Sequence, residues 1–322
     1  MAIPLQTAVF WKLLSTLTGK SMFQLPNDKV RAASDRQRRA TRLPGASLIT
    51  GRANRDVLII EQTATVPDGT DLGVVIYRPR GTAGQILPVI VNFHGGGFIA
   101  GDPYQSQWWC SSVAGGVGAV VVSVDYRLAP EHPFPAAPED CYAATVWTIE
   151  HAEELGIDPA RLAVMGDSAG GNLAAVVALM ARDRGGPSIA FQLLLYPSVE
   201  FVDSFPSEDE NAHAPILGKA DLGAASGRYC TAEQAITPYA SPLRAPSHAG
   251  LPPALIQTAQ HDPLRDQGSA YAQALQAAGV PARLTNYVDA VHGYISIPGV
   301  VPAARQALGE AVAVLRDALA AV

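Results

Sequence analysis

Residues 161–186 read RLAVMGDSAGGNLAAVVALMARDRGG, and they give the clearest indication of the fold in the sequence. Its first seven residues form a short apolar run that ends in Gly-Asp, which is typical of a buried strand. A segment rich in alanine and leucine follows at once and closes on two glycines, which predicts a helix. The pattern Gly-x-Ser-x-Gly, at Gly166, Ser168 and Gly170, spans the junction. We therefore predict a strand, a very sharp turn and a helix, with a serine at the tip of the turn.

The rest of the chain repeats this alternation of strand and helix. Apolar, β-branched runs are separated by helix-like segments, and the first two runs flank a turn at 67–71, which predicts an antiparallel pair. Alternation of this kind favours an α/β fold, with a mostly parallel sheet and helices on both faces. The predicted strands are 57–66, 72–79, 87–94, 118–126, 161–167, 191–197, 253–259 and 282–288.

Two segments depart from the alternation. Residues 1–50 have a helical, amphipathic pattern that ends near Pro44-Gly45. Residues 198–237 lie between two predicted strands; they are polar and rich in proline and glycine at first, and helical later. An insertion at the carboxyl edge of a sheet is a natural lid. We therefore expect an α/β core of residues 51–197 and 238–322, a cap at 198–237, and an N-terminal region, 1–50, that contributes to the cap.

Composition excludes several classes of partner. The 322 residues are 48% hydrophobic with a net charge of −6, and no basic tract is long enough to suggest nucleic acid. No apolar run approaches the roughly 20 residues that span a bilayer, and the N-terminus lacks the features of a signal peptide. Cys110, Cys141 and Cys230 lack the spacing of a metal site and predict free thiols. We expect a cytoplasmic protein with no metal, no nucleic-acid partner and no membrane span.

The serine at the sharp turn can act as a nucleophile only with a base and an acid to activate it. The alternative is a capping serine at a glycine-softened helix start. His292 is the candidate base, because it follows the last predicted strand and precedes the last helix. Asp262 is the candidate acid, because it ends the stretch PALIQTAQHD at the carboxyl end of a strand. Asp266 is held in reserve, as an acidic residue of the first helical turn is ordinary there.

Five motifs occur together and in a fixed order. They are HGGGF (94–98), YRLAPEHPFPAA (126–137), GDSAGGN (166–172), DPLRDQG (262–268) and HGY (292–294). From about residue 85 to the C-terminus, the chain resembles the hormone-sensitive-lipase-like branch of the α/β-hydrolases, also called bacterial family IV carboxylesterases. The resemblance implies an α/β-hydrolase fold with a helical cap, and an enzyme that needs no cofactor.

The resemblance also assigns site residues. It implies Ser168 as nucleophile, Asp262 as acid and His292 as base, in agreement with the positions reasoned above. It places the oxyanion donors on the backbone N–H groups of Gly96, Gly97 and Ala169. Glycine loses the most backbone entropy on folding, so three in a row need a reason. A bare backbone close to the substrate supplies that reason, and His94 then becomes a residue that shapes the loop.

Other positions are less settled by the resemblance. Asp167 and Glu131 resemble residues that support the site by hydrogen bonding, although Glu131 is equally well explained as a surface carboxylate. The chain departs from the family pattern at Gln267, where an acidic residue is more usual, and at Tyr294 and Asp289. These departures leave the three proposed catalytic residues untouched and change the surroundings of His292.

The implied function is hydrolysis of a small-molecule carboxylic ester through an acyl-enzyme intermediate. The alternatives are an amide, carbamate or lactone hydrolase with the same three residues, or a ligand receptor that has lost catalysis, which the presence of His292 disfavours. Aromatic and apolar residues near the site lead to the hypothesis of a pocket for short or medium acyl chains, against the alternative of ordinary core. The residues concerned are Trp108, Trp109, Phe201, Phe205, Ile216 and Leu217. The resemblance also suggests a homodimer through an edge strand and the terminal helix.

Overall fold

A computed structural model describes residues 3–18, 21–41 and 43–320 of the chain. Within this part of the chain, eight strands form one sheet in the order β1-β2-β4-β3-β5-β6-β7-β8. β1, β2 and β4 pair antiparallel, and all neighbours from β4 to β8 pair parallel. The strands are β1 (Val57–Thr65), β2 (Asp71–Pro79), β3 (Leu87–Phe93), β4 (Val120–Asp125), β5 (Ile157–Asp167), β6 (Phe191–Leu195), β7 (Ala254–His261) and β8 (Ala282–Val291). The prediction of a mostly parallel, eight-stranded α/β sheet is confirmed.

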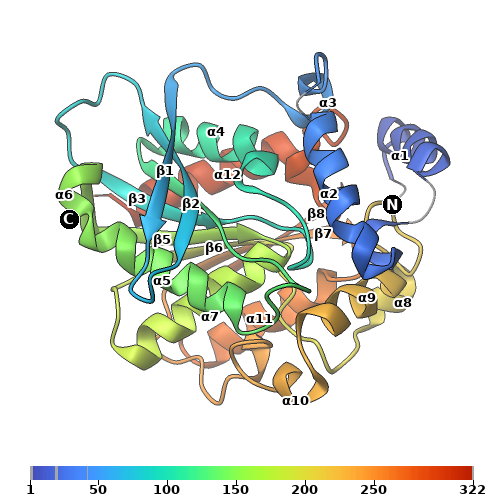
Figure 1. The fold of residues 1–322 in the computed structure, drawn as a ribbon. Helices are drawn as coiled ribbons and strands as arrows, with labels where there is room; N and C mark the ends of the chain where they lie inside the picture. Colours follow the sequence, from blue (N-terminus) through green and yellow to red (C-terminus); the bar gives the residue numbers. More distant parts are fainter. Residues whose placement is uncertain (1–2, 19–20, 42, 321–322) are drawn as a thin grey trace.

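Helices cover both faces of this sheet (Figure 1). α4 and α12 pack together on one face, and α5 and α7 pack together on the other, with α11 beside β7 and β8. The helices are α1 (Leu5–Thr18), α2 (Asn27–Thr41), α3 (Ser47–Thr50), α4 (Gln107–Val117), α5 (Ala136–Glu150), α6 (Ala152–Leu155), α7 (Ala169–Arg184), α8 (Pro206–Glu210), α9 (Lys219–Tyr229), α10 (Ala232–Ala235), α11 (Arg265–Ala277) and α12 (Ala303–Ala318), with short 3₁₀ turns η1 (Met22–Gln24), η2 (Pro103–Ser106), η3 (Pro242–Arg244) and η4 (Tyr294–Ser296).

The core lies on the two faces of the sheet and follows the period of two residues that a strand imposes. In β3, Val89, Val91 and Phe93 enter the core beside α5 and α7, whereas Ile90 enters the core beside α4 and α12. Every residue of β3 is buried, as expected for a strand covered on both faces. The continuous apolar run in the sequence therefore signals a central strand.

The register of the parallel strands brings their carboxyl ends to one edge. Phe93 at the end of β3 pairs with Gly166 near the end of β5, and Asp167 pairs with Leu195 at the end of β6. The helices α1, α2, α8 and α9, from opposite halves of the chain, lie at the side of the molecule where β7 and β8 end (Figure 1). Loops that leave these strand ends carry the sequence motifs, so the fold gathers them at one edge.

β5 is longer than the sequence predicts. Its predicted run begins at Arg161, but the strand begins at Ile157 and includes Asp158, Pro159 and Ala160. Ile157 pairs with Leu87, and the next pair joins Val89 to Leu162, so residues 158–161 lie in a register shift between the two pairs. Tertiary pairing thus extends a strand into residues whose own pattern does not indicate one.

Candidate active site

Ser168 occupies the turn between β5 and α7 with φ 55° and ψ −116°. Its N–H donates to the carbonyl of Leu195, at 2.9 Å, which ties the turn to β6. A Cβ atom on Gly166 would lie 2.1 Å from the carbonyl oxygen of Gly170, and one on Gly170 would lie 1.9 Å from that of Phe93. Both obstacles are backbone atoms that cannot rotate away, so the two glycines of the motif are required by the sharpness of the turn.

The structure brings Ser168, His292 and Asp262 into one chain of hydrogen bonds. Nε2 of His292 lies 2.9 Å from Oγ of Ser168, and Nδ1 lies 2.7 Å from Oδ2 of Asp262. Asp262 is fully buried, and its Oδ1 accepts from the N–H of Leu264 at 2.8 Å. A carboxylate can only accept hydrogen bonds, so His292 donates from Nδ1 and keeps Nε2 to accept the serine proton.

Asp266, the reserve candidate for the acid, faces another part of the molecule. Its carboxylate accepts from the N–H of Ser207 at 2.9 Å and forms an ion pair with Arg265. It therefore links the insertion between β6 and β7 to the start of α11.

The loop after β3 carries two glycines with positive φ, a conformation that glycine adopts more readily than other residues. Gly96 has φ 126° and Gly97 has φ 62°, and a Cβ atom on Gly96 would lie 2.0 Å from the carbonyl oxygen of Ala100. Among the described residues, no hydrogen-bond acceptor is paired with the N–H of Gly96 or Gly97. Ala169 is the first residue of α7, and N–H groups of a first helical turn have no partner within the helix. None of the three predicted donors thus has a hydrogen-bond acceptor among the described residues.

Asp167 holds this loop against the serine turn. Its Oδ1 accepts from the N–H of Gly95 at 3.0 Å, and Oδ2 accepts from the hydroxyl of Tyr196 at 3.4 Å. Burial raises the pKa of the Asp167 carboxyl to about 6, and the Gly95 hydrogen bond and the charge of His292 oppose that rise. Tyr196 packs edge-on against the His292 ring, at 4.8 Å between centroids. Tyr196 was missed in the sequence, although its position directly after β6 could have identified it.

His94 contributes to the loop and contacts neither Ser168 nor Asp262. Its Nδ1 lies 2.8 Å from the carbonyl oxygen of Gly95, and its ring stacks on Tyr126 at 4.3 Å between centroids. Burial lowers the pKa of His94, which favours the neutral ring. These contacts are those of a residue that shapes the loop.

Residues from two distant segments lie over the glycine loop. A Cβ atom on Gly97 would lie 2.7 Å from the ring of Phe23 in η1 and 3.2 Å from Cβ of Ala225 in α9. Arg228 of α9 joins the two segments, since its guanidinium donates to the carbonyls of Phe23 and Leu25 at 2.6 and 2.5 Å. Phe23 carries no motif, so its place beside the loop could not be found in the sequence.

The predicted apolar pocket is only partly matched by the residues named for it. Phe201 joins Phe98 and Tyr229 in an aromatic cluster beside the glycine loop. Trp109 is instead an ordinary core residue, fully buried, with its indole N–H on the sulfur of Met165 at 3.2 Å. Its inclusion in the pocket was wrong, because a helix after a glycine loop turns one face into the core.

The other residues named for the pocket also differ in their burial and in their distance from the site. Trp108 packs against the backbone of Gly51 and belongs to the same buried cluster as Trp109, which favours the alternative of an ordinary core residue. Leu217 is buried, whereas Phe205 is half-buried. Ile216 lies beside the site, with its side chain next to Gly293.

The contacts of Glu131 and Gln267 show what these two residues do in the structure. Glu131 forms an ion pair with Arg31 at 3.6 Å, with both side chains about half exposed, so it is a surface carboxylate. Oε1 of Gln267 accepts from the N–H groups of Val199 and Glu200 at 2.9 and 3.1 Å. A neutral amide oxygen thus fills the acceptor role at a position where the family more often has an acid.

The three cysteines form no disulfide in the structure. Cys110, Cys141 and Cys230 are free thiols, and burial raises the pKa of each. In the described part of the chain, no group of three or more His, Cys, Asp or Glu side chains is arranged to hold a metal ion. No helix of the described ranges is long and apolar enough to cross a bilayer.

Comparison with known proteins identifies the family. A family model described as the alpha/beta hydrolase fold matches residues 90–296. The esterase LipI of Mycobacterium tuberculosis is 45% identical over 296 residues, which cover 91% of this chain and 90% of that protein. The carboxylesterase NlhH of the same organism is 48% identical over 267 residues, covering 81% and 83%.

A solved structure agrees over nearly the whole chain. The crystal structure of a thermostable esterase from Pseudomonas putida superposes with a TM-score of 0.90 at 36% identity, covering 99% of this chain and 98% of that one. The chain therefore belongs to the α/β-hydrolases, in their hormone-sensitive-lipase-like branch, and is a carboxylic ester hydrolase.

Proposed function

We propose that Ser168 is the nucleophile, His292 the general base and Asp262 the orienting acid of a serine carboxylesterase. The single observation that carries the proposal is the unbroken chain of contacts from Ser168 Oγ through His292 to Asp262, at 2.9 and 2.7 Å. Ser168 attacks the ester carbonyl while Nε2 of His292 accepts its proton. Asp262 holds the imidazole in the tautomer that can accept and stabilises its charged form.

The negative charge of the tetrahedral intermediate falls on the former carbonyl oxygen. The proposed donors to it are the N–H groups of Gly96, Gly97 and Ala169. Losing one such donor typically reduces the rate by about 100- to 1,000-fold. His292 then protonates the departing alcohol, and the acyl group remains on Ser168. Water repeats the sequence and releases the carboxylic acid, so the proposed reaction needs no metal or organic cofactor.

The test is Ser168→Ala, with the surface variant Ser188→Ala as matched control. Removing the nucleophile of a serine hydrolase lowers kcat by up to about 10⁶-fold. We expect hydrolysis of p-nitrophenyl acetate by Ser168→Ala to fall to background, with an unchanged circular dichroism spectrum, and Ser188→Ala to match the parent enzyme. Hydrolysis that survives in Ser168→Ala would refute the assignment.

The proposed substrates are esters of short or medium acyl chains. The proposal is supported by bulky apolar side chains close to the glycine loop and to His292, namely Phe23, Phe201, Ile216 and Tyr229. Side chains of this size limit the room for an acyl chain. Turnover across a chain-length series of p-nitrophenyl esters should peak at short to medium chains, and an optimum at long chains would contradict the proposal.

We also propose that residues 1–50 and 198–237 together form the cap over the α/β core of 51–197 and 238–322. The hydrogen bonds of Arg228 to the N-terminal segment support it.

A homodimer and a cytoplasmic setting complete the proposal. β8 is an edge strand with Leu284 and Val288 exposed, and unpaired edges are templates for pairing. Leu284→Lys should convert a dimer to a monomer in light scattering; a wild-type monomer would contradict the dimer.

A further inference from the structure

The direction of the Gly96 N–H depends on the residue before it. A peptide unit is planar and trans, so the carbonyl of Gly95 and the N–H of Gly96 point in opposite directions. Two groups fix that carbonyl: Nδ1 of His94 lies 2.8 Å from its oxygen, and Nε2 of Gln105 donates to it at 3.0 Å. Whatever holds Gln105 therefore helps to aim the Gly96 N–H.

Gln105 is in turn held by Asp102. Oδ1 of Asp102 accepts from the N–H of Gln105 at 3.0 Å and from that of Tyr104 at 2.9 Å, which caps the turn η2. The Asp102 side chain is only 6% exposed. A carboxylate removed from water to this extent is stabilised by a nearby cation, and leaving it unpaired is strongly unfavourable.

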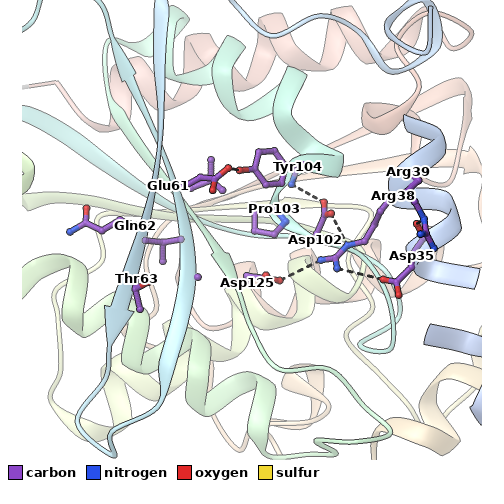
Figure 2. A pocket seen from close by; sticks show the side chains of 13 residues that line it. Asp35, Arg38, Arg39, Glu61, Gln62, Thr63, Asp102, Pro103, Tyr104 and Asp125 are labelled. Carbon is purple, nitrogen blue, oxygen red and sulfur yellow. Dashed lines mark hydrogen bonds and ion pairs between the residues drawn. The ribbon is translucent and has the colours of Figure 1, made fainter. Parts of the chain in front are cut away.

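Arg38 of α2 brings a cation to Asp102 from 64 residues earlier in the chain. Its Nε lies 2.7 Å from Oδ2 of Asp102, an ion pair without hydrogen-bond geometry. The same guanidinium lies 3.9 Å from a carboxylate oxygen of Asp35 and 3.9 Å from one of Asp125. Figure 2 shows Arg38 reaching from its helix into the space between these three carboxylates.

We propose that Arg38 is a positioning residue for the oxyanion donor Gly96, acting through Asp102, Gln105 and the carbonyl of Gly95. The proposal rests on the proposed function, since it takes Gly96 as a donor to the oxyanion. Arg38 touches no reacting atom. Arg38 acts on the carbonyl of Gly95, whereas Asp167 accepts from the N–H of the same residue. The two therefore fix the loop from opposite sides.

The space around Arg38 allows a chemical test. Arg38 and Asp102 both line a cavity of about 620 Å³ between α2, η2 and the strands β1 and β2 (Figure 2). The Arg38 side chain is 31% exposed, so solvent reaches it. Truncation to alanine would leave a site beside Asp102 that a free guanidinium ion can enter from this cavity.

The experiment compares Arg38→Ala with Arg36→Ala, an exposed arginine two residues away on the same helix. A donor that is misaimed weakens transition-state binding more than ester binding, so kcat of Arg38→Ala should fall about tenfold with KM within about twofold. Guanidinium chloride, below concentrations that unfold proteins, should restore much of the lost kcat. Equal ionic strength of sodium chloride should not, and Arg36→Ala should behave as wild type. Arg38→Lys keeps the charge and should retain more activity than Arg38→Ala.

A trifluoromethyl ketone separates this inference from the proposed function. It adds to a serine and carries an oxyanion, so its affinity reports on the donors. If the wild-type enzyme binds it no more tightly than an ester, the proposed function fails whatever Arg38 does. If the wild type binds it tightly and Arg38→Ala changes neither kcat nor this affinity, only the role of Arg38 is overturned.

A second variant tests the proposal if Arg38→Ala does not fold. Asp102→Asn removes the charge that Arg38 pairs with and keeps an acceptor for the N–H of Gln105. The proposal then requires a lower kcat and weaker ketone binding in that variant, at unchanged KM, and wild-type values would overturn it.

Discussion

Replacing Asp167 by asparagine should make the protein more stable at neutral pH and less active. Asp167 is a buried carboxylate whose pKa is raised by burial to about 6. Asparagine has nearly the same shape, its oxygen can still accept from the N–H of Gly95, and its amide can donate to the hydroxyl of Tyr196. The substitution therefore removes a buried negative charge and leaves the packing almost unchanged.

The magnitude follows from linkage between protonation and folding. The Asp167 pKa rises from its ordinary 3.8 to about 6 in the folded state, so the folded protein binds this proton more tightly than the unfolded chain. The stabilisation from that tighter binding is fully present below about pH 3.8 and is lost as the pH rises through 6. One pKa unit corresponds to about 1.4 kcal/mol, so the ionised group costs about 3 kcal/mol at pH 7. Asparagine does not titrate and avoids this cost.

The assay is urea unfolding of wild type and Asp167→Asn across a pH series from about 4 to 8. The difference in free energy of unfolding, variant minus wild type, should rise by up to about 3 kcal/mol between pH 4 and 7 and then level off. Titrations of groups that do not interact with Asp167 cancel in this difference. In the control Asp158→Asn the difference should stay nearly flat over this range, because Arg161 lowers the pKa of that carboxyl below 3.8 and the group therefore titrates below about pH 4.

Asp167→Asn should lower the activity although it raises the stability. The negative charge of Asp167 interacts with His292, and it favours the imidazolium that forms when the serine proton is transferred. We expect Asp167→Asn to lower kcat several-fold at pH 7. A difference in unfolding free energy that is constant from pH 4 to 7 would refute the reasoning, because it would mean that burial of this charge carries no cost.

Three further substitutions test the packing of the site. Gly170→Ala forces a Cβ atom against the backbone oxygen of Phe93, at 1.9 Å, so it should misplace the serine turn and lower kcat by about 100-fold or more, or prevent soluble expression. Gln267→Leu leaves two buried N–H groups without their acceptor and should cost about 2–4 kcal/mol in urea unfolding, whereas Gln267→Glu keeps the acceptor and should recover most of it. Asn172→Ala removes the donor to two buried carbonyls and should lower the thermal midpoint, with a loss of about 2 kcal/mol.

The sequence was sufficient where the signal is local. The strand, the sharp turn and the helix around Ser168 follow from adjacent residues, and the structure has them at β5 and α7. Asp262 and His292 are predictable because they follow late strands, and parallel strands bring their carboxyl ends to one edge. The hydrogen bonds to Ser168 arise from that topology.

The sequence was insufficient where a role depends on a partner far away in the chain. Phe23 and Arg38 sit in an N-terminal region that reads as amphipathic helix, and no spacing marks them as neighbours of Gly97 or Asp102. For Trp109 the prediction fails in the opposite way, because closeness in the sequence did not mean closeness in space. Trp109 lies close to the glycine loop in the chain, yet the helix that begins between them turns it into the core.

The loop after β3 is held through Gly95, so the N–H groups of the proposed oxyanion donors Gly96 and Gly97 are not needed to hold it. The N–H of Gly95 is held by Asp167, and its carbonyl by His94 and Gln105. These contacts reach it from the serine turn, from the adjacent residue and from η2. Because the peptide between Gly95 and Gly96 is planar, fixing one end of it aims the other. The N–H of Gly96 is therefore oriented before any ligand arrives and has no partner among the described residues, which is the condition for a preorganised oxyanion donor.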